Sequence, residues 1–344
     1  MRNDLKSNSL KSIHFDTTYN CVPLTPKNLR LLVVSGFDEL NNRTCICCFI
    51  LIMDEKEETF LEIFKVLREK PYHMNPIYMM SDFALGQIKA VKKIYPNALY
   101  NGCFFHWSQC IWKTIQYYGL RGKGTYKINM TILFNLQLLC FIPRNKVNNL
   151  FKKIRKKLDI NDNTNKLFNY FNKYWLGKRY PIKLWNYYDR LHNASNNSLS
   201  KYITTNNLNE NINKFLNLNL KGGRNSFENF KDSIENVFIQ FEEKLANKHI
   251  DDTKTKILNF YVDKINEESN FNYSVLSYEA IDSLLDLYKN DGFENVNGPY
   301  NEEQIGDIDL ERLPYDSEPD EDGEYSSSEE YLELDEHYAY VYSI

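Results

Sequence analysis

The chain has 344 residues, a formal net charge of −4 and 42% hydrophobic residues, which allows one large domain or two ordinary ones with an ample core. It has no run of about 18 apolar residues and no apolar stretch at its start, so the sequence predicts neither a membrane-spanning helix nor a secretory signal. The seven cysteines, three of them clustered as "CICC" at 45–48, favour reduced intracellular thiols over a disulfide framework.

The net charge hides an asymmetry along the chain. From Asp291 onward there are 18 acidic residues and one basic residue, so residues 1–290 carry a net charge of +13. Between Arg121 and Arg224 the balance is 20 basic residues to 4 acidic ones. Such a segment suits a polyanion such as nucleic acid, but an ordinary lysine-rich solvated surface explains the charge equally well.

The first third of the chain predicts a sheet with helices. Residues 12–20 alternate between polar and apolar side chains, whereas 29–37 and 44–53 are dense in apolar residues, as buried strands are. We expect strands at 12–20, 29–37, 44–53, 76–82 and 97–105, a hairpin turn at 41–42, and helices at 57–70, 83–95 and 107–119. Three strands in hairpin order followed by strand–helix–strand units predict a mixed sheet with helices on its faces.

From about residue 125 the hydrophobic period becomes helical and the charge becomes basic. We expect helices at 145–158, 165–177 and 182–191, one beginning near 207, a long one at 225–248, and shorter ones at 257–265 and 278–288. Beyond residue 300 the chain is acidic and contains Ser, Pro and Gly, which predicts a disordered tail.

The stretch "NGCFFHWSQ", 101–109, places Cys103 three residues before His106. The spacing fits half of a zinc site, but a structural zinc site needs four ligands and no second Cys/His pair lies at a suitable distance. A thiol nucleophile needs a positioned base and an oxyanion site, and only the nearby histidine supports that interpretation. A buried pair packed beside the end of a strand is the interpretation that the sequence favours.

Two aspartates are placed where enzymes bind metals. Asp16 lies on the polar face of the first expected strand and Asp82 ends the fourth, and neighbouring strands would bring both to one sheet edge. Oxygen ligands so placed suit Mg²⁺ or Mn²⁺, and a pair of such ions promotes in-line phosphoryl displacement. Glu210, on the helix that begins near 207, is the candidate third carboxylate. Alternatively, the aspartates are turn residues or helix caps, and the glutamate is an ordinary solvent-exposed helical residue.

Three segments resemble blocks of Mutator-like element (MULE) transposases. "SDFALGQIKAVKKIYPNALYNGCFFHWSQCIWKTI" is similar to the central block, which has a strand-terminal Asp followed by Phe and later Gly-Cys-x-Phe-His. "HFDTTYN" resembles the first block, and "YWLGKRYPIKLWNYYDRL" with "TTNNLNENINKFL" resembles the last. The three blocks occur in the family's order, and the resemblance extends from about 13 to 248.

The resemblance implies an α/β, ribonuclease H-like mixed sheet interrupted by a mostly α-helical insertion. It also implies a DDE-type site in which Asp16, Asp82 and Glu210 hold two Mg²⁺ or Mn²⁺ ions for DNA strand cleavage and strand transfer at transposon ends. Cys103 and His106 then belong to a structural motif. The implied partners are DNA and further copies of the chain in an active homo-oligomer, with no membrane, and the implied location is the nucleus.

These inferences divide the chain into segments. They are an N-terminal tail (1–12), the core with the first two acids (13–110), the basic helical insertion (111–200), helices with the third acid (201–250), C-terminal helices (251–299) and the acidic tail (300–344). Two positions depart from the family pattern: Ala84 where a Glu is frequent and Thr204 where an Arg is common. Family members usually carry an upstream zinc-binding domain, so we expect this chain to be a truncated copy or a fragment.

Two other functions remain open at this stage. A domesticated or decayed relative would bind DNA through the basic insertion without cutting it. A different nuclease on the same fold would use the same acids, and only the family resemblance separates it from a transposase.

Overall fold

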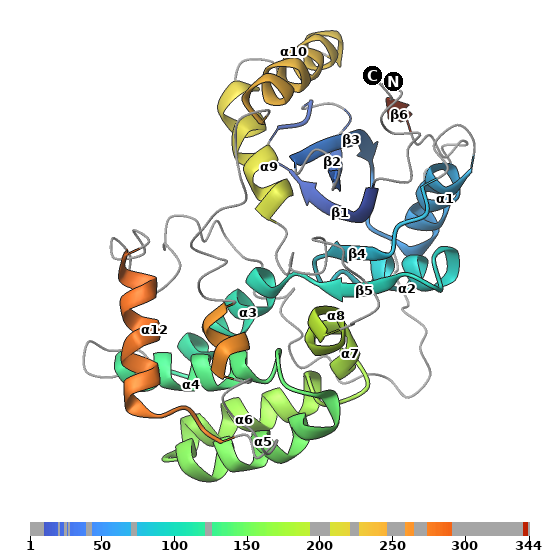
Figure 1. The fold of residues 1–344 in the computed structure, drawn as a ribbon. Coiled ribbons are helices and arrows are strands. Elements are labelled where there is room, and N and C mark those ends of the chain that lie inside the picture. The colour runs from blue at the N-terminus through green and yellow to red at the C-terminus, as the bar shows by residue number, and fades with distance from the viewer. Residues whose placement is uncertain are drawn as a thin grey trace.

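In a computed structural model the chain forms a mixed sheet flanked by helices and a second, helical lobe (Figure 1). The structure describes residues 10–19, 21–23, 26, 28–38, 43–69, 74–120, 126–192, 207–220, 227–245, 259–264, 274–290 and 340–342. The mixed α/β class expected from the sequence is confirmed.

The sheet has six strands in the order β5-β4-β1-β2-β3-β6. They are β1 (Leu10–Thr18), β2 (Arg30–Asp38), β3 (Arg43–Ile52), β4 (Tyr78–Ser81), β5 (Leu99–Gly102) and β6 (Tyr340–Tyr342). The first three strands are antiparallel neighbours, whereas β4 is parallel to β1 and β5 is parallel to β4. The five predicted strands are therefore present, with shorter bounds for β4 and β5, and β6 is an addition that the sequence did not predict.

Two pairs of helices cover the two faces of the sheet. Helices α1 (Glu57–Arg68) and α2 (Leu85–Ile94) share a core with Leu32 and Val34 of β2. The opposite face, with Leu31 and Val33, packs against α9 (Asn207–Asn219) and α10 (Phe227–Leu245). Successive side chains of a strand point to opposite faces, so the dense apolar runs in the sequence supply both cores.

The helical lobe lies below the sheet in Figure 1. It contains α3 (Phe104–Tyr117), α4 (Tyr126–Leu138), α5 (Arg144–Leu158), α6 (Asp162–Tyr174), α7 (Ile182–Trp185), α8 (Tyr188–His192) and α12 (Tyr278–Asn290), together with helical residues 259–264. Its core is aromatic: the ring of Trp107 stacks on Trp185 at 5.7 Å and meets Trp175 at 5.9 Å. These contacts join α3, which directly follows the sheet, to the rest of the lobe.

The single helix predicted at 182–191 is divided into α7 and α8. Asn186, between them, has an extended backbone, and its side-chain amide donates hydrogen bonds to the carbonyl oxygens of Leu139 and Ile142 at 2.9 and 2.8 Å. These tertiary hydrogen bonds hold the end of α4 and compete with helix continuation.

Some expectations fall outside the described residues. The predicted turn at 41–42, Thr204 and most of the acidic tail lie there, and only the β6 residues of the tail are described. Among the helices that the structure describes, none combines the length and apolar character needed to cross a membrane.

Candidate metal centre

Asp16 lies near the C-terminal end of β1, an inner strand of the sheet. Its register partner in β2 is Val33, and its side chain is on the face that meets α9 and α10, with only 6% of its surface exposed. The side-chain amide of Asn213 in α9 donates a hydrogen bond of 2.6 Å to Oδ2 of Asp16. A buried carboxylate requires such a partner, so α9 fixes the position of this group.

Asp82 follows the last residue of β4, the strand that runs parallel beside β1. In this register His14 is opposite Met80, and continuing it by two residues brings Asp82 level with Asp16. The backbone carbonyl of Asp82 accepts hydrogen bonds from the hydroxyls of Ser81 and Tyr100, at 2.9 and 3.3 Å. The two predicted aspartates therefore meet at one edge, as neighbouring parallel strands require.

His106 joins these two aspartates. One potential ligand atom from each of Asp16, Asp82 and His106 lies within 4.8 Å of the other two. Three atoms so spaced lie at most about 2.8 Å from a common centre, close to the metal–ligand distances of about 2.0–2.6 Å seen for divalent ions. Small side-chain rotations would bring all three onto one ion.

The side chains around this centre fit a bound cation. Within the described part of the chain, neither Oδ1 of Asp82 nor Nδ1 of His106 has a hydrogen-bond partner, although both atoms are buried. Burial alone would lower the pKa of His106, but Cys103 and the carboxylates of Asp82 and Asp16 outweigh it and raise the pKa well above 6.5. The same negative field that favours a proton on the imidazole favours a metal ion between the carboxylates.

Glu210, the third predicted acid, lies in α9, and its side chain is outside the described residues. Its backbone position is informative, because Asn213, which contacts Asp16, is three residues further along the same helix. Residues three apart in a helix are neighbours on one face. The structure therefore brings Asp16 and Asp82 together and places the helix that carries Glu210 beside them.

The stretch 101–109 connects the sheet to the helical lobe. The Cys103 side chain is fully buried, and its backbone N–H donates to the Ser81 carbonyl at 2.7 Å. A Cβ atom on Gly102 would lie 2.3 Å from the ring of Phe83, so glycine is needed for this close approach. The Gly-Cys and Asp-Phe parts of the central block are therefore in direct contact, and the buried Cys103 sulfur has no access to a substrate.

Two polar residues of this centre were not assigned to it from the sequence. His106 was placed in a structural motif, although its spacing from Cys103 had suggested metal binding as an alternative. The sequence alone assigns no role to Asn213. An asparagine one turn from a candidate acid was the available signal, but only the packing of α9 on β1 gives it a role.

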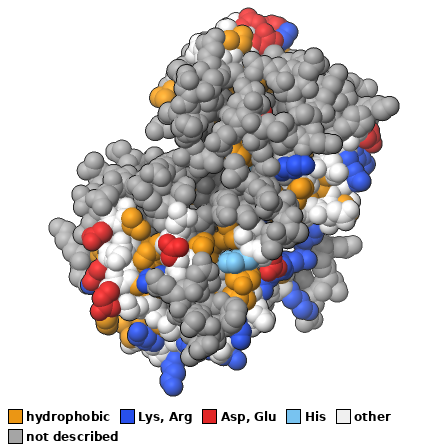
Figure 2. Space-filling model, in the orientation of Figure 1, with side chains coloured by type: hydrophobic (Ala, Val, Ile, Leu, Met, Phe, Trp, Pro, Cys, Tyr) orange, Lys and Arg blue, Asp and Glu red, His pale blue; other side chains and the backbone are white. Residues whose placement is uncertain are grey.

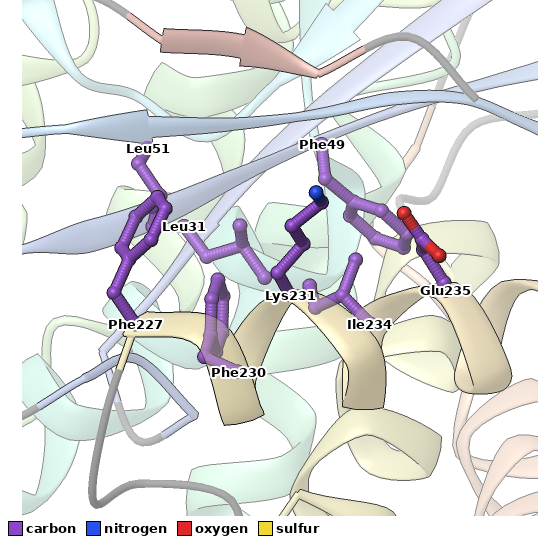
Figure 3. Close-up of a pocket in the computed structure, with 8 residues that line it drawn as sticks. All are labelled: Leu31, Phe49, Leu51, Phe227, Phe230, Lys231, Ile234 and Glu235. Atoms are coloured by element: carbon purple, nitrogen blue, oxygen red, sulfur yellow. The ribbon is translucent and has the colours of Figure 1, made fainter.

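A separate pocket lies between α10 and the sheet, as Figure 3 shows. It is lined mainly by apolar side chains: Leu31, Phe49 and Leu51 from the strands, and Phe227, Phe230 and Ile234 from α10. These side chains belong to the core on the α10 side of the sheet. The two charged residues in its lining, Lys231 and Glu235, come from α10, so this mainly apolar pocket differs in chemistry from the centre at Asp16.

Comparison with known proteins gives one family match. Residues 12–110 match the MULE transposase domain, which confirms the resemblance to Mutator-like element transposases over this part of the chain and supports a transposase-related role. The matched segment contains Asp16, Asp82, Cys103 and His106, whereas Glu210 lies beyond it. No curated protein matches the chain.

Proposed function

Because residues 12–110 match the MULE transposase domain, we propose that this chain is a DDE-type transposase, which cuts DNA at transposon ends and joins the strands. The observation that carries the proposal is the approach of Asp16 and Asp82, whose ligand atoms lie within 4.8 Å of each other. Among the residues that the structure describes, none bonds the buried Oδ1 atom of Asp82, which leaves this atom available to a cation.

Glu210 is the third acid of the proposed site. The hydrogen bond from Asn213 to Asp16 anchors α9 against β1, and Glu210 is on the preceding turn of that helix. The match to the family ends before α9, so this assignment is supported by the position of the helix and by the resemblance of its sequence block.

Each side chain has a limited task in this chemistry. Asp16, Asp82 and Glu210 would hold two Mg²⁺ or Mn²⁺ ions, which when bound supply positive charge to the phosphoryl group and lower the pKa of bound water. Asn213 keeps the Asp16 carboxylate oriented, and the Ser81 and Tyr100 hydroxyls hold the backbone of Asp82. Water is the first nucleophile and a freed 3′-hydroxyl the second, so the protein mainly contributes positioning and charge neutralisation.

The helical lobe carries positive charge suited to DNA. Exposed basic residues on α5 and α6 are Arg144, Lys152, Lys156, Lys157, Lys166 and Lys173. Figure 2 shows Lys and Arg side chains along the lower surface of this lobe. Clustered cations of this kind bind the phosphate backbone and release counterions. We include in the proposal that the chain acts in the nucleus and as a homo-oligomer when active.

The arrangement of strands supports the ribonuclease H-like part of the proposal. Three antiparallel strands in hairpin order are followed by two parallel strands on the other side of β1. In this order Asp16 is on the inner strand β1 and Asp82 directly follows its parallel neighbour β4, which is the arrangement that the proposed chemistry needs.

The test is strand nicking of plasmid DNA by the full chain with Mn²⁺. We expect Asp82→Asn and Glu210→Gln each to lower the nicking rate at least about 100-fold, because each removes a metal ligand. Asp232→Asn and Glu235→Gln make the same chemical changes at exposed positions on α10 and should retain the wild-type rate. Nicking that survives Asp82→Asn would overturn the assignment.

The same assay separates the other functions. A DNA-binding protein without catalysis would bind DNA in a salt-sensitive manner, unaffected by a chelator, and would not nick it. A nuclease other than a transposase would nick DNA but would not join a supplied 3′-hydroxyl end to a target strand.

A further inference from the structure

The imidazole of His106 shares the centre at the sheet edge with two carboxylates. A ring nitrogen of His106 and one oxygen each of Asp16 and Asp82 lie within 4.8 Å of one another. We propose that His106 is a direct ligand of the metal ion held by Asp16 and Asp82, and that this nitrogen ligand makes the site favour Mn²⁺ over Mg²⁺. The inference rests on the proposed function, since it concerns the same metal centre.

The fold holds the start of α3, which carries His106, through contacts on both sides of this residue. His106 is in the first turn of α3, which begins shortly after β5. The backbone N–H of Cys103 donates a hydrogen bond to the carbonyl oxygen of Ser81, the residue before Asp82. The next residue, Trp107, is fully buried, and its ring stacks on Trp185 at 5.7 Å. The start of α3 is thereby tied to the end of β4, which holds the backbone of His106 beside Asp82.

The polar atoms at this point have unused bonding capacity. In the described part of the chain, Nδ1 of His106 and Oδ1 of Asp82 are buried and make no hydrogen bond. A buried nitrogen and a buried carboxylate oxygen without partners each cost free energy, and a cation bound by these two atoms would remove both costs.

An imidazole changes which ion the site prefers. Mg²⁺ takes oxygen ligands in a near-ideal octahedron and keeps several waters. Imidazole suits first-row transition metals such as Fe²⁺, Ni²⁺ and Zn²⁺, and Mn²⁺ belongs to that series, whereas Mg²⁺ does not. A site with two carboxylates and one nitrogen should therefore bind Mn²⁺ more tightly, relative to Mg²⁺, than a site with three carboxylates. The chain would then be most active where Mn²⁺ is present, even though Mg²⁺ is usually the more abundant ion.

The test measures the metal directly, on the full-length chain. Pulsed electron paramagnetic resonance of the Mn²⁺-loaded protein should show coupling to a directly bound ¹⁴N nucleus. The coupling should disappear in His106→Asn and remain in His192→Asn, which changes an exposed histidine on α8. Absence of the coupling in the loaded wild-type chain, or its persistence in His106→Asn, would overturn the proposal, and the wild-type spectrum decides even if the variant does not fold.

The preference for Mn²⁺ over Mg²⁺ is tested by titrating the protein with each ion. We expect His106→Asn to weaken Mn²⁺ binding at least about tenfold. His106→Asp supplies an oxygen in place of the nitrogen, and we expect it to restore Mn²⁺ binding while lowering the preference for Mn²⁺ over Mg²⁺. An unchanged ratio of the two dissociation constants in His106→Asp would contradict the selectivity part.

These results can be separated from the test of catalysis. If Asp82→Asn abolishes Mn²⁺ binding but His106→Asn does not, the metal centre stands and the role of His106 is refuted. If the nitrogen coupling is present but no DNA is cut, His106 is a ligand and the proposed enzymatic function fails. If the wild-type chain binds no Mn²⁺, both proposals fall.

Discussion

Asn213 connects two parts of the chain that are almost 200 residues apart. Its amide donates to the carboxylate of Asp16, which is the most buried of the three described residues of the proposed metal centre, Asp16, Asp82 and His106. Partners that orient a metal ligand frequently matter to metal affinity nearly as much as the ligand itself. Asn213 is accordingly a positioning residue in the proposed mechanism.

We expect Asn213→Leu to reduce Mn²⁺-dependent nicking and Mn²⁺ affinity by about 10–100-fold. Leucine has a similar size and a better helix propensity, so α9 should still form and the fold should be retained. The measurements are Mn²⁺ titration, the nicking rate and helical content by circular dichroism. The matched control is Asn236→Leu at an exposed position on α10. Unchanged Mn²⁺ affinity in Asn213→Leu would show that Asp16 does not depend on this hydrogen bond.

At the scale of residues, the sequence pointed to Asp16 and Asp82 as members of this centre. It did not point to His106 or Asn213, which lie beside them. Asp16 and Asp82 were expected to meet on the condition that their strands are neighbours, because local patterns locate the strand ends but not the strand order. The position of His106 depends on how α3 leaves β5 and packs through Trp107, and no local pattern specifies that angle. The bond between Asn213 and Asp16 spans 197 residues, which sequence periodicity cannot detect.

Helix α9 covers one face of the sheet with a narrow apolar stripe. Leu216 is fully buried in the core shared with Val33 and Phe49, whereas Leu218, two residues later, is 64% exposed. Two residues along a helix correspond to a rotation of about 200°, so these leucines point in nearly opposite directions. The same residue type thus has two very different environments in one helix.

We expect Leu216→Asp to lower the free energy of unfolding by about 3–5 kcal/mol, because it removes buried packing and places an unpaired carboxyl group in the core. Leu218→Asp, the control on the same helix, should change it by no more than about 0.5 kcal/mol. Urea denaturation of both variants measures the difference. Equal effects would show that α9 does not pack on the sheet through this stripe.

At the scale of elements, hydrophobic periods in the sequence predicted the regular strands and helices. Features that depend on tertiary interactions were not predicted. The strands β1, β2 and β3 and the helices α1, α2 and α5 have the hydrophobic periods from which they were predicted. The break between α7 and α8 was not predicted because it depends on hydrogen bonds from Asn186 to residues more than 40 positions away. Strand β6 was missed because it follows a long acidic stretch and pairs with the edge of β3.

At the scale of the whole molecule, the proposed metal centre and the exposed basic residues lie in different parts. The metal centre is on the sheet, and the basic residues of α5 are on the helical lobe. Lys152, Lys156 and Lys157 lie on the exposed side of α5, opposite its buried stripe. By contrast, two of the three lysines on α2, Lys89 and Lys93, form ion pairs with Glu57 at 3.5 and 2.6 Å. The α5 surface is therefore better suited to bind phosphate groups than the α2 surface.

We expect replacement of the three α5 lysines by glutamine to weaken DNA binding and to reduce the salt dependence of the affinity. Each lost phosphate contact should lower the slope of log K against log salt concentration by about 0.9. The same three-charge change on α2, at Lys89, Lys92 and Lys93, is the control and should leave the slope nearly unchanged. Titrations of labelled duplex at several salt concentrations give both slopes. An equal decrease in the slope for the α5 and α2 variants would indicate that DNA binding depends only on the net charge of the protein.

The return of α9 to the sheet also has a consequence during synthesis of the chain. The strands β1 to β5 leave the ribosome first, and about 100 residues separate the end of β5 from the start of α9. At roughly 5–20 residues per second, the face that includes Leu31, Val33 and Leu51 stays uncovered for roughly 5–20 s. A nascent sheet with an open apolar face is a substrate for chaperones, and slow translation of the helical lobe would prolong its exposure.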